Sequence, residues 1–276
     1  MLKDVVVNLS SGGERDSAAE FAISIAQTFK AHLAGIAFAY EPVIPATIMG
    51  GIPTEIIESQ RDESMKWAQG ATGAFETAAK AAAISHESRI VDASLAGAAD
   101  LFAQISRRFD ISVVGQAERK SASPTDLIIE GALFESGRPV IVVPFIQKTA
   151  LKLEKVLIAW DGSRQAARAI ADSMPFLERA GQIEILIVRG ERGKAYQTRG
   201  AVMSQHLERH GLNVSVNQIT SPTADPQSTI LSHIADTGTD FLVMGGYGHS
   251  RLREFILGGV TRSMLGSMTI PVLMSH

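Results

Sequence analysis

Glycines gather near the C-terminus in a pattern suited to holding a phosphate group. Five of them lie within fifteen residues, after an apolar run that ends at Met244: Gly245, Gly246, Gly248, Gly258 and Gly259. A glycine has no Cβ, so its backbone N–H can approach an anion closely. A helix that opens at about Gly259–Thr261 would add its unpaired first N–H groups and the positive end of its dipole. The pattern predicts a phosphate cradle built from main chain.

Other glycine motifs do not fit this sequence. A Walker A loop needs glycine, four residues and then Gly-Lys-Ser/Thr. Here Gly193-Lys194 has Val188 at the position of the first glycine and Ala195 at the position of the Ser/Thr. A dinucleotide fingerprint would need a glycine at Arg251. A purely structural role, in turns and helix caps, stays open for the glycines.

Asp161 is a second candidate for ligand contact. The triplet Asp161-Gly162-Ser163 follows the apolar run Val156–Ala159. Ligands of open parallel sheets bind beyond the carboxyl ends of the strands, where the strand order reverses. A carboxylate there can accept hydrogen bonds from ribose hydroxyls or a base amine. Asp-Gly-Ser is equally good turn chemistry, so that alternative also stays open.

The elements that must position these residues alternate between strands and helices. Short apolar runs predict seven strands, within Val5–Val7, Ile111–Val114, Val140–Val143, Val156–Ala159, Ile183–Val188, Phe241–Met244 and Pro271–Met274. Helical spacing is found in Ser17–Ala31 and Ser163–Ala180, with Ser17 and Ser163 as expected N-caps. This alternation predicts an α/β fold made of βαβ units.

The chain reads as one unit written twice. Asp110–Gly115 matches Asp240–Gly245, and the stretches at the first and last strands of each half match in the same order. We therefore expect two domains, 1–148 and 149–276. Residues 1–150 carry 13 Lys and Arg against 18 Asp and Glu, whereas residues 151–276 carry 13 against 11. The second half is electrostatically the better host for an anion.

Residues 41–82 make the first half longer. The stretch opens with the Pro- and Gly-rich EPVIPATIMGGIP and becomes helical around Glu55–Ala83. We interpret Met65 and Trp67 as helix-packing residues rather than as a ligand pocket. The Pro- and Gly-rich part is an alternative candidate for an interaction loop.

Composition excludes several classes of protein. The 276 residues include no cysteine, which rules out disulfides and thiolate chemistry. No apolar run approaches the ~20 residues of a membrane span, and the N-terminus lacks the features of a signal peptide. The net charge of −3 and 6% aromatic residues favour neither nucleic acid nor membrane as a partner. We therefore expect a soluble cytoplasmic protein.

No catalytic or metal constellation stands out. His206 and His210 lie one helical turn apart, but a third metal ligand is not identifiable and a solvated helix face is the favoured interpretation. We predict no metal site made of side chains alone and no catalytic residues.

The glycine spacing resembles that of the universal stress protein family. The family pattern is glycine, two residues, glycine, nine residues, glycine and then glycine or serine, which Gly245, Gly248, Gly258 and Gly259 satisfy. Val260-Thr261 and Asp161 also fit, and the resemblance covers the whole chain as two copies. It implies two Rossmann-like domains of the adenine nucleotide α-hydrolase type. Each would have a five-stranded parallel sheet of order 3-2-1-4-5 with helices on both faces.

The resemblance also implies a ligand and its contacts. Many members bind ATP, alone or with Mg²⁺, and Val188 and Ala159 would then lie against the nucleoside, with Asp161 lining its pocket. The phosphates would be held by the glycine loop and the helix start. These residues are Gly245, Gly248, His249, Gly258, Gly259, Val260 and Thr261. Gly259 offers an N–H but no hydroxyl, which leaves the metal open.

The first half departs from this pattern. Aligned on its last strand, it has Asp126 and Leu127 in place of Gly258 and Gly259, Glu118 in place of Gly248, and Ser10 in place of Asp161. Acidic side chains at two phosphate-facing positions would repel a triphosphate. We therefore expect a degenerate copy that does not bind ATP and that is kept for structure or domain pairing, or binds a different ligand.

Three functions follow from these expectations. The favoured one is a non-enzymatic ATP-binding stress-response or signalling module, in which the two domains pair and a homodimer can form. The second is a slow ATPase, for which Asp161 and His249 are the available but poor candidates. The third is a nucleotide-free dimerising scaffold.

Overall fold

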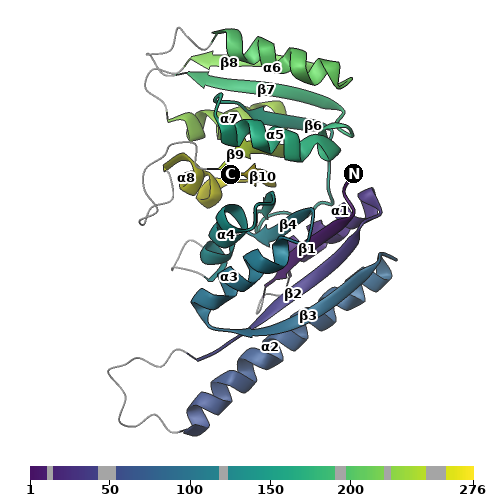
Figure 1. The fold of residues 1–276 in the computed structure, drawn as a ribbon, viewed down its shortest axis with the longest axis vertical. Coiled ribbons are helices and arrows are strands. Elements are labelled where there is room, and N and C mark those ends of the chain that lie inside the picture. The colour runs from purple at the N-terminus through teal and green to yellow at the C-terminus, as the bar shows by residue number, and fades with distance from the viewer. Residues whose placement is uncertain (11–14, 43–53, 118–123, 190–196, 221–224, 247–258) are drawn as a thin grey trace. The chain divides into compact units, whose positions relative to one another are not determined.

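Strands and helices alternate along the chain in the computed structural model (Figure 1). The structure describes all residues except 11–14, 43–53, 118–123, 190–196, 221–224 and 247–258. The strands of the first half are β1 (Asp4–Leu9), β2 (His32–Tyr40), β3 (His86–Ala93), β4 (Ile111–Gly115) and β5 (Val140–Val143). Its helices are α1 (Ser17–Phe29), α2 (Thr54–Ala81), α3 (Leu95–Ser106) and α4 (Pro124–Glu135).

The second half repeats the sequence of elements. Its strands are β6 (Lys155–Ala159), β7 (Gln182–Arg189), β8 (Val214–Thr220), β9 (Phe241–Gly245) and β10 (Val272–Ser275). Its helices are α5 (Arg164–Leu177), α6 (Gln197–Arg209), α7 (Pro226–Thr237) and α8 (Gly259–Ser267). All seven strands predicted from apolar runs are present.

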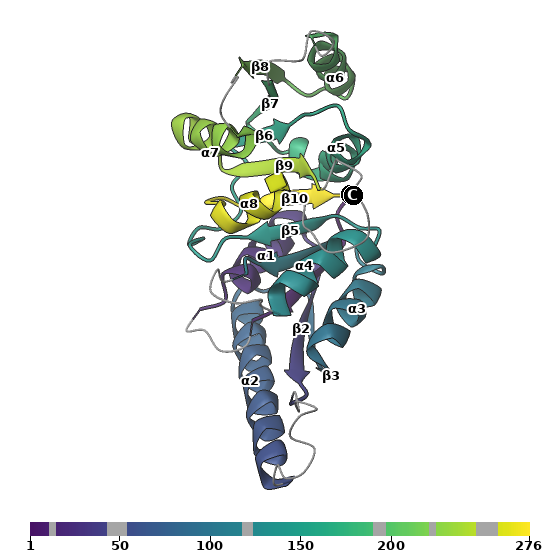
Figure 2. The same cartoon turned by 90° about the vertical axis from the view of Figure 1, so that its left-hand side faces the viewer.

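The predicted fold class is confirmed. The strand order is β3-β2-β1-β4-β5 in the first half and β8-β7-β6-β9-β10 in the second, which is 3-2-1-4-5 twice. In the second half, α5 and α6 cover one face of the sheet and α7 and α8 the other (Figure 2). Cover on both faces explains the continuous apolar strands, such as Val156-Leu157-Ile158, whose side chains are buried.

The chain folds as two compact units. One contains Leu2–Arg138 and the other Pro139–His276 together with Met1. Within the second unit, β5 pairs antiparallel with β10, and Ile141 lies opposite Leu273. These two residues occupy equivalent positions in the two repeats, after Pro139 and Pro271. The strand pair therefore has the self-matching register of an isologous contact, made here between the fifth strands of one chain.

Both halves fix the start of their first strand with the same aspartate. The Asp110 carboxylate accepts hydrogen bonds from the backbone N–H groups of Lys3 and Asp4, at 2.7 and 3.0 Å. The equivalent Asp240 accepts from Glu154 and Lys155, at 3.0 and 3.1 Å. The two carboxylates bind the first strand to the start of the fourth in each unit. This shared device supports a duplication.

Helix α2 is longer than the strands it covers. Its 28 residues span about 42 Å at 1.5 Å per residue. Its buried residues, Ala68, Thr72, Phe75 and Ala79, all lie in its second half. Trp67 is 51% exposed. The prediction that its side chain packs α2 against the rest of the protein is therefore wrong for about half of its surface. Within the described residues, no helix is long and apolar enough to cross a membrane.

The N-cap of α1 differs from the prediction. Ser17 is the first helical residue, and the cap is Asp16, whose Oδ1 accepts from Ala19 N at 3.0 Å. The other oxygen of Asp16 accepts from Ser10 N at 2.7 Å. A carboxylate at this position satisfies an orphan N–H and also interacts favourably with the helix dipole. The predicted cap of α5, Ser163, is confirmed, with Ala166 N donating to its Oγ at 3.1 Å.

Replacing the observed cap is expected to cost more than replacing the predicted one. Asp16→Ala removes acceptors for two backbone N–H groups and should lower the free energy of unfolding by about 1 kcal/mol. Ser17→Ala should change it by less than about 0.5 kcal/mol. Urea unfolding of both variants checks this. Equal losses would mean that Asp16 is not the cap.

Candidate functional site

The carboxyl ends of three neighbouring strands meet at one edge of the second unit. Strand β6 pairs with β7 on one side and with β9 on the other, so that Ala159 lies opposite Leu186 and Met244. The chain leaves β6 toward β7 and returns to the far side through β9, which makes this edge the switch point of the sheet. Val188 stands near the end of β7 and Gly245 ends β9. The structure thus brings Ala159, Val188 and Gly245 to one edge of the sheet, with Asp161 just beyond the end of β6.

Asp161 makes the turn that the alternative interpretation expected. Its Oδ1 accepts from Ser163 N at 2.8 Å, and Gly162 between them has a φ of 78°, which favours glycine. The residue is exposed, so its carboxylate lies at the strand edge in contact with solvent. A turn-forming role and a ligand contact through Oδ2 are therefore compatible in geometry.

Gly245 has a packing role of its own. A Cβ built on it would lie 2.5 Å from Ala166 N and 2.8 Å from Gln165 C, both in the first turn of α5. Only a residue without a side chain lets α5 approach β9 this closely. The backbone after Gly245 continues along the strand edge, where Gly246 N donates to Ser275 O at 2.9 Å. The glycine at 245 is therefore explained without a ligand.

Helix α8 begins at Gly259, as the sequence predicts. Its first N–H groups, from Gly259, Val260 and Thr261, have no partner within the helix by the geometry of any α-helix. The predicted site residues Gly248, His249 and Gly258 lie outside the described residues.

Sequence reasoning missed Trp160, which stands between Ala159 and Asp161. Its indole Nε1 is buried and has no hydrogen-bond partner among the described residues. Its backbone N–H donates to Leu186 O at 2.9 Å. No spacing or motif marks this residue, because a tryptophan at a strand end is ordinary packing chemistry.

The equivalent edge of the first unit carries different chemistry. Ser10 replaces Asp161, and its N–H is used by the Asp16 cap. Asp126 lies in the first turn of α4, where a carboxylate satisfies the helix dipole that an anion would otherwise use. Glu118 lies outside the described residues. Asn8 takes the place of Ala159, and its Oδ1 is buried without a partner among the described residues.

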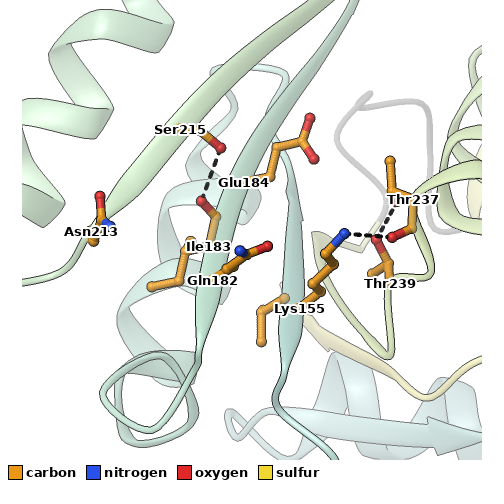
Figure 3. Close-up of a pocket in the computed structure, with 9 residues that line it drawn as sticks. Lys155, Gln182, Ile183, Glu184, Asn213, Ser215, Thr237 and Thr239 are labelled. Carbon is orange, nitrogen blue, oxygen red and sulfur yellow. Dashed lines mark hydrogen bonds between the residues drawn. The ribbon is translucent and has the colours of Figure 1, made fainter.

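A polar hollow lies at the opposite, amino edge of the second unit (Figure 3). Its volume is about 300 Å³. The Lys155 ammonium donates to Thr237 O at 2.8 Å, and Glu184 pairs with His233 at 3.0 Å. The hollow lies away from the predicted ligand edge, and its lysine is already committed to a carbonyl.

Asp240, at the same edge, has a raised pKa because burial outweighs its two backbone hydrogen bonds. Because the pKa of Asp240 is higher in the folded than in the unfolded protein, folding favours the protonated carboxyl. The stability that Asp240 contributes is therefore complete below its ordinary pKa of 3.8 and is lost as the pH rises through the folded-state pKa. Relative to Asp240→Asn, the wild type should therefore gain stability on acidification. Urea unfolding of both proteins at neutral pH and at the lowest pH where both fold checks this. A wild type that loses stability relative to Asp240→Asn on acidification would contradict the prediction.

His206 and His210 lie on the exposed side of α6 with their ring centroids 4.9 Å apart. Within the described ranges, no group of three or more His, Asp and Glu side chains is placed to hold a metal ion. Helix geometry alone accounts for the histidine pair.

The C-terminal part of the chain matches a known protein family. The model of the universal stress protein family matches residues 188–276. The chain is similar to universal stress protein Slr1230 of Synechocystis, with 28% identity over 141 residues, which cover 49% of this chain and 46% of that protein. It is also similar to universal stress protein YxiE of Bacillus subtilis, with 24% identity over 43% of this chain and 96% of that protein. The match thus spans about half the length of the cyanobacterial protein.

A solved structure shares the architecture along the whole chain. A universal stress protein from Archaeoglobus fulgidus superposes with a TM-score of 0.74 over 98% of this chain and 97% of its own, at 16% identity. At that identity the likeness concerns the fold, which is the twofold arrangement described above. Together with the family model and the curated relatives, it confirms the resemblance seen in the glycine spacing. The last third of the chain thus matches the universal stress protein family, and the whole chain shares the two-domain fold of a solved universal stress protein.

Proposed function

We propose that this protein binds ATP through its C-terminal half and works as a nucleotide-responsive stress or signalling module without turnover. The observation that carries the proposal is the collection of Ala159, Asp161, Val188 and Gly245 at the switch point of the β6–β9 sheet. Ligands of open α/β sheets bind at this place.

The residues present fit the parts of an adenine nucleotide. Ala159 and Val188 are both half-buried, which leaves apolar surface at the strand ends for a base. The exposed carboxylate of Asp161 can accept from ribose hydroxyls. The first N–H groups of α8 and the glycine loop before it, with Gly248, His249 and Gly258, would hold the phosphates. Bound Mg²⁺ would have to rely on the phosphates, because Gly259 supplies no hydroxyl.

The first half is proposed not to bind ATP. Asp126 already occupies the first turn of α4 with negative charge, and Ser10 donates its N–H to Asp16. A triphosphate placed there would meet close like charge. The first half would then act through its fold and its strand β5, which pairs with β10.

Thermal unfolding with increasing ATP tests the binding, and single-turnover phosphate release with protein in excess tests for chemistry. We expect the melting temperature to rise with ATP concentration and phosphate release to stay at the level of buffer. Release of one phosphate per bound ATP would show that the protein is an ATPase and not a module without turnover. A melting temperature that does not change with ATP would contradict both the ATP-binding module and the ATPase, and would favour a nucleotide-free scaffold.

A further inference from the structure

Strand β8 ends the strand order of the second unit. It pairs with β7 along one side, from Val214 opposite Ile183 to Thr220 opposite Arg189. Among the residues that the structure describes, no strand pairs with its other side. Figure 1 shows β8 as the last strand after β6 and β7. Such an edge presents a row of backbone N–H and C=O groups that can pair with another strand.

The sequence of β8 lacks the features that usually protect an edge. It reads VSVNQIT, with no charge and no proline over seven residues. Val216 is 38% exposed. Natural edge strands are commonly blunted by charged residues, proline or bulges, which prevent pairing with other chains.

The edge strand of the first unit, β3, provides the contrast. It reads HESRIVDA and carries an exposed ion pair between Arg89 and Glu87 at 3.2 Å. If β3 paired antiparallel with a copy of itself about Arg89, the two Arg89 side chains would face each other. Like charges directly opposite each other destabilise such a pair. The chain thus protects one edge by charge and leaves the other open.

Strand β8 is compatible with a copy of itself. Antiparallel pairing about its central residue sets Asn217 opposite Asn217, Val216 opposite Gln218 and Ser215 opposite Ile219. Every pair is uncharged, so none opposes the contact. The same kind of self-matching register already exists in this chain, where the equivalent residues Ile141 and Leu273 face each other in the β5–β10 pair.

We propose that a second copy of this chain pairs with β8 through its own β8, antiparallel and centred on Asn217, to give a twofold-symmetric dimer. This goes beyond ATP binding and does not depend on it. A strand pair of seven residues is small beside a standard protein interface, so the dimer is expected to dissociate on dilution.

Opposite charges at the centre test the pairing and its register together. In sedimentation velocity over a concentration series, the wild type should shift from 29.5 kDa to twice that mass. Asn217→Asp and Asn217→Lys should each stay at 29.5 kDa at all concentrations, because each sets like charges opposite each other. A 1:1 mixture of the two variants should recover the doubled mass. Arg89→Asp, the matched charge change on β3, should behave as the wild type.

Backbone amide hydrogen exchange gives a readout that needs no variant. Exchange within 214–220 should slow in the wild type as concentration rises, while exchange within 86–93 should not change. A wild type that stays monomeric, a dimer that both Asn217 variants leave intact, or a mixture no better than its components would overturn the proposal.

Discussion

Adding one methyl group at residue 245 is expected to lower the free energy of unfolding by about 2 kcal/mol, as overpacking does in a closely packed core. In Gly245→Ala the new Cβ would lie 2.5 Å from Ala166 N, and the atoms it meets are mainly backbone, which cannot swing aside as a side chain can. Relief requires α5 to move away from β9. Thermal unfolding should show a melting temperature roughly 4–8 °C below that of the wild type.

The duplicate half supplies the matched control. Gly115 ends β4 as Gly245 ends β9, but a Cβ there would meet only Ala18 Cβ, at 3.7 Å. Gly115→Ala should therefore leave stability within about 0.5 kcal/mol of the wild type. If both variants lost the same stability, the close approach of α5 to Gly245 would not be the cause.

A glutamate at residue 248 is expected to abolish stabilisation by ATP. Gly248→Glu gives the second half the acidic residue that the first half has at Glu118. A ligand at a hundred times its dissociation constant stabilises a protein by about 2.7 kcal/mol, and close like charge should remove that gain. The measurement is the rise of melting temperature with ATP in the wild type and the variant. Without ATP, the free energies of unfolding of the wild type and the variant should agree within about 0.5 kcal/mol, because the substitution is expected to act on ligand binding and not on the fold.

Gly266→Glu serves as the control for charge alone. It lies seven residues after the start of α8, and a Cβ there would meet no atom within 4 Å. This variant should keep the full response to ATP. A Gly248→Glu protein that responds to ATP as the wild type does would place the nucleotide elsewhere.

Asp161→Ala should weaken ATP binding less than Gly248→Glu, because the main-chain contacts to the phosphates remain. The variant also loses the acceptor for Ser163 N, so its melting without ATP must be measured beside its response. A complete loss of the ATP response in Asp161→Ala would contradict a main-chain cradle as the principal contact.

The fold was largely accessible from sequence because its central strands are buried on both faces. Continuous runs such as Val140–Val143 mark strands whatever their neighbours are. Strands β2, β3 and β8 gave no such signal. Strand β2 is rich in alanine and glycine because α2 lies close, and a Cβ on Gly35 would come within 2.8 Å of the Phe75 ring. Strands β3 and β8 are edges, whose partly exposed faces carry polar residues.

Only the parts of the candidate site that are marked by residue spacing within one segment could be predicted from the sequence. Glycine spacing and the aspartate after a strand are patterns within one segment, and the strand order then carries Asp161 and Gly245 to the same edge. The close contact between Gly245 and α5 depends on how a distant helix packs, which spacing does not encode. The same is true of the Glu184–His233 pair, whose members are 49 residues apart.

The most direct test of the account is a crystal structure of the full chain grown or soaked with millimolar ATP. The account predicts one nucleotide per chain at the carboxyl ends of β6 and β9, with its phosphates toward the start of α8 and the first-half edge free of nucleotide. An empty edge in the second half, or a nucleotide bound at Asn8 and Ser10 instead, would contradict it.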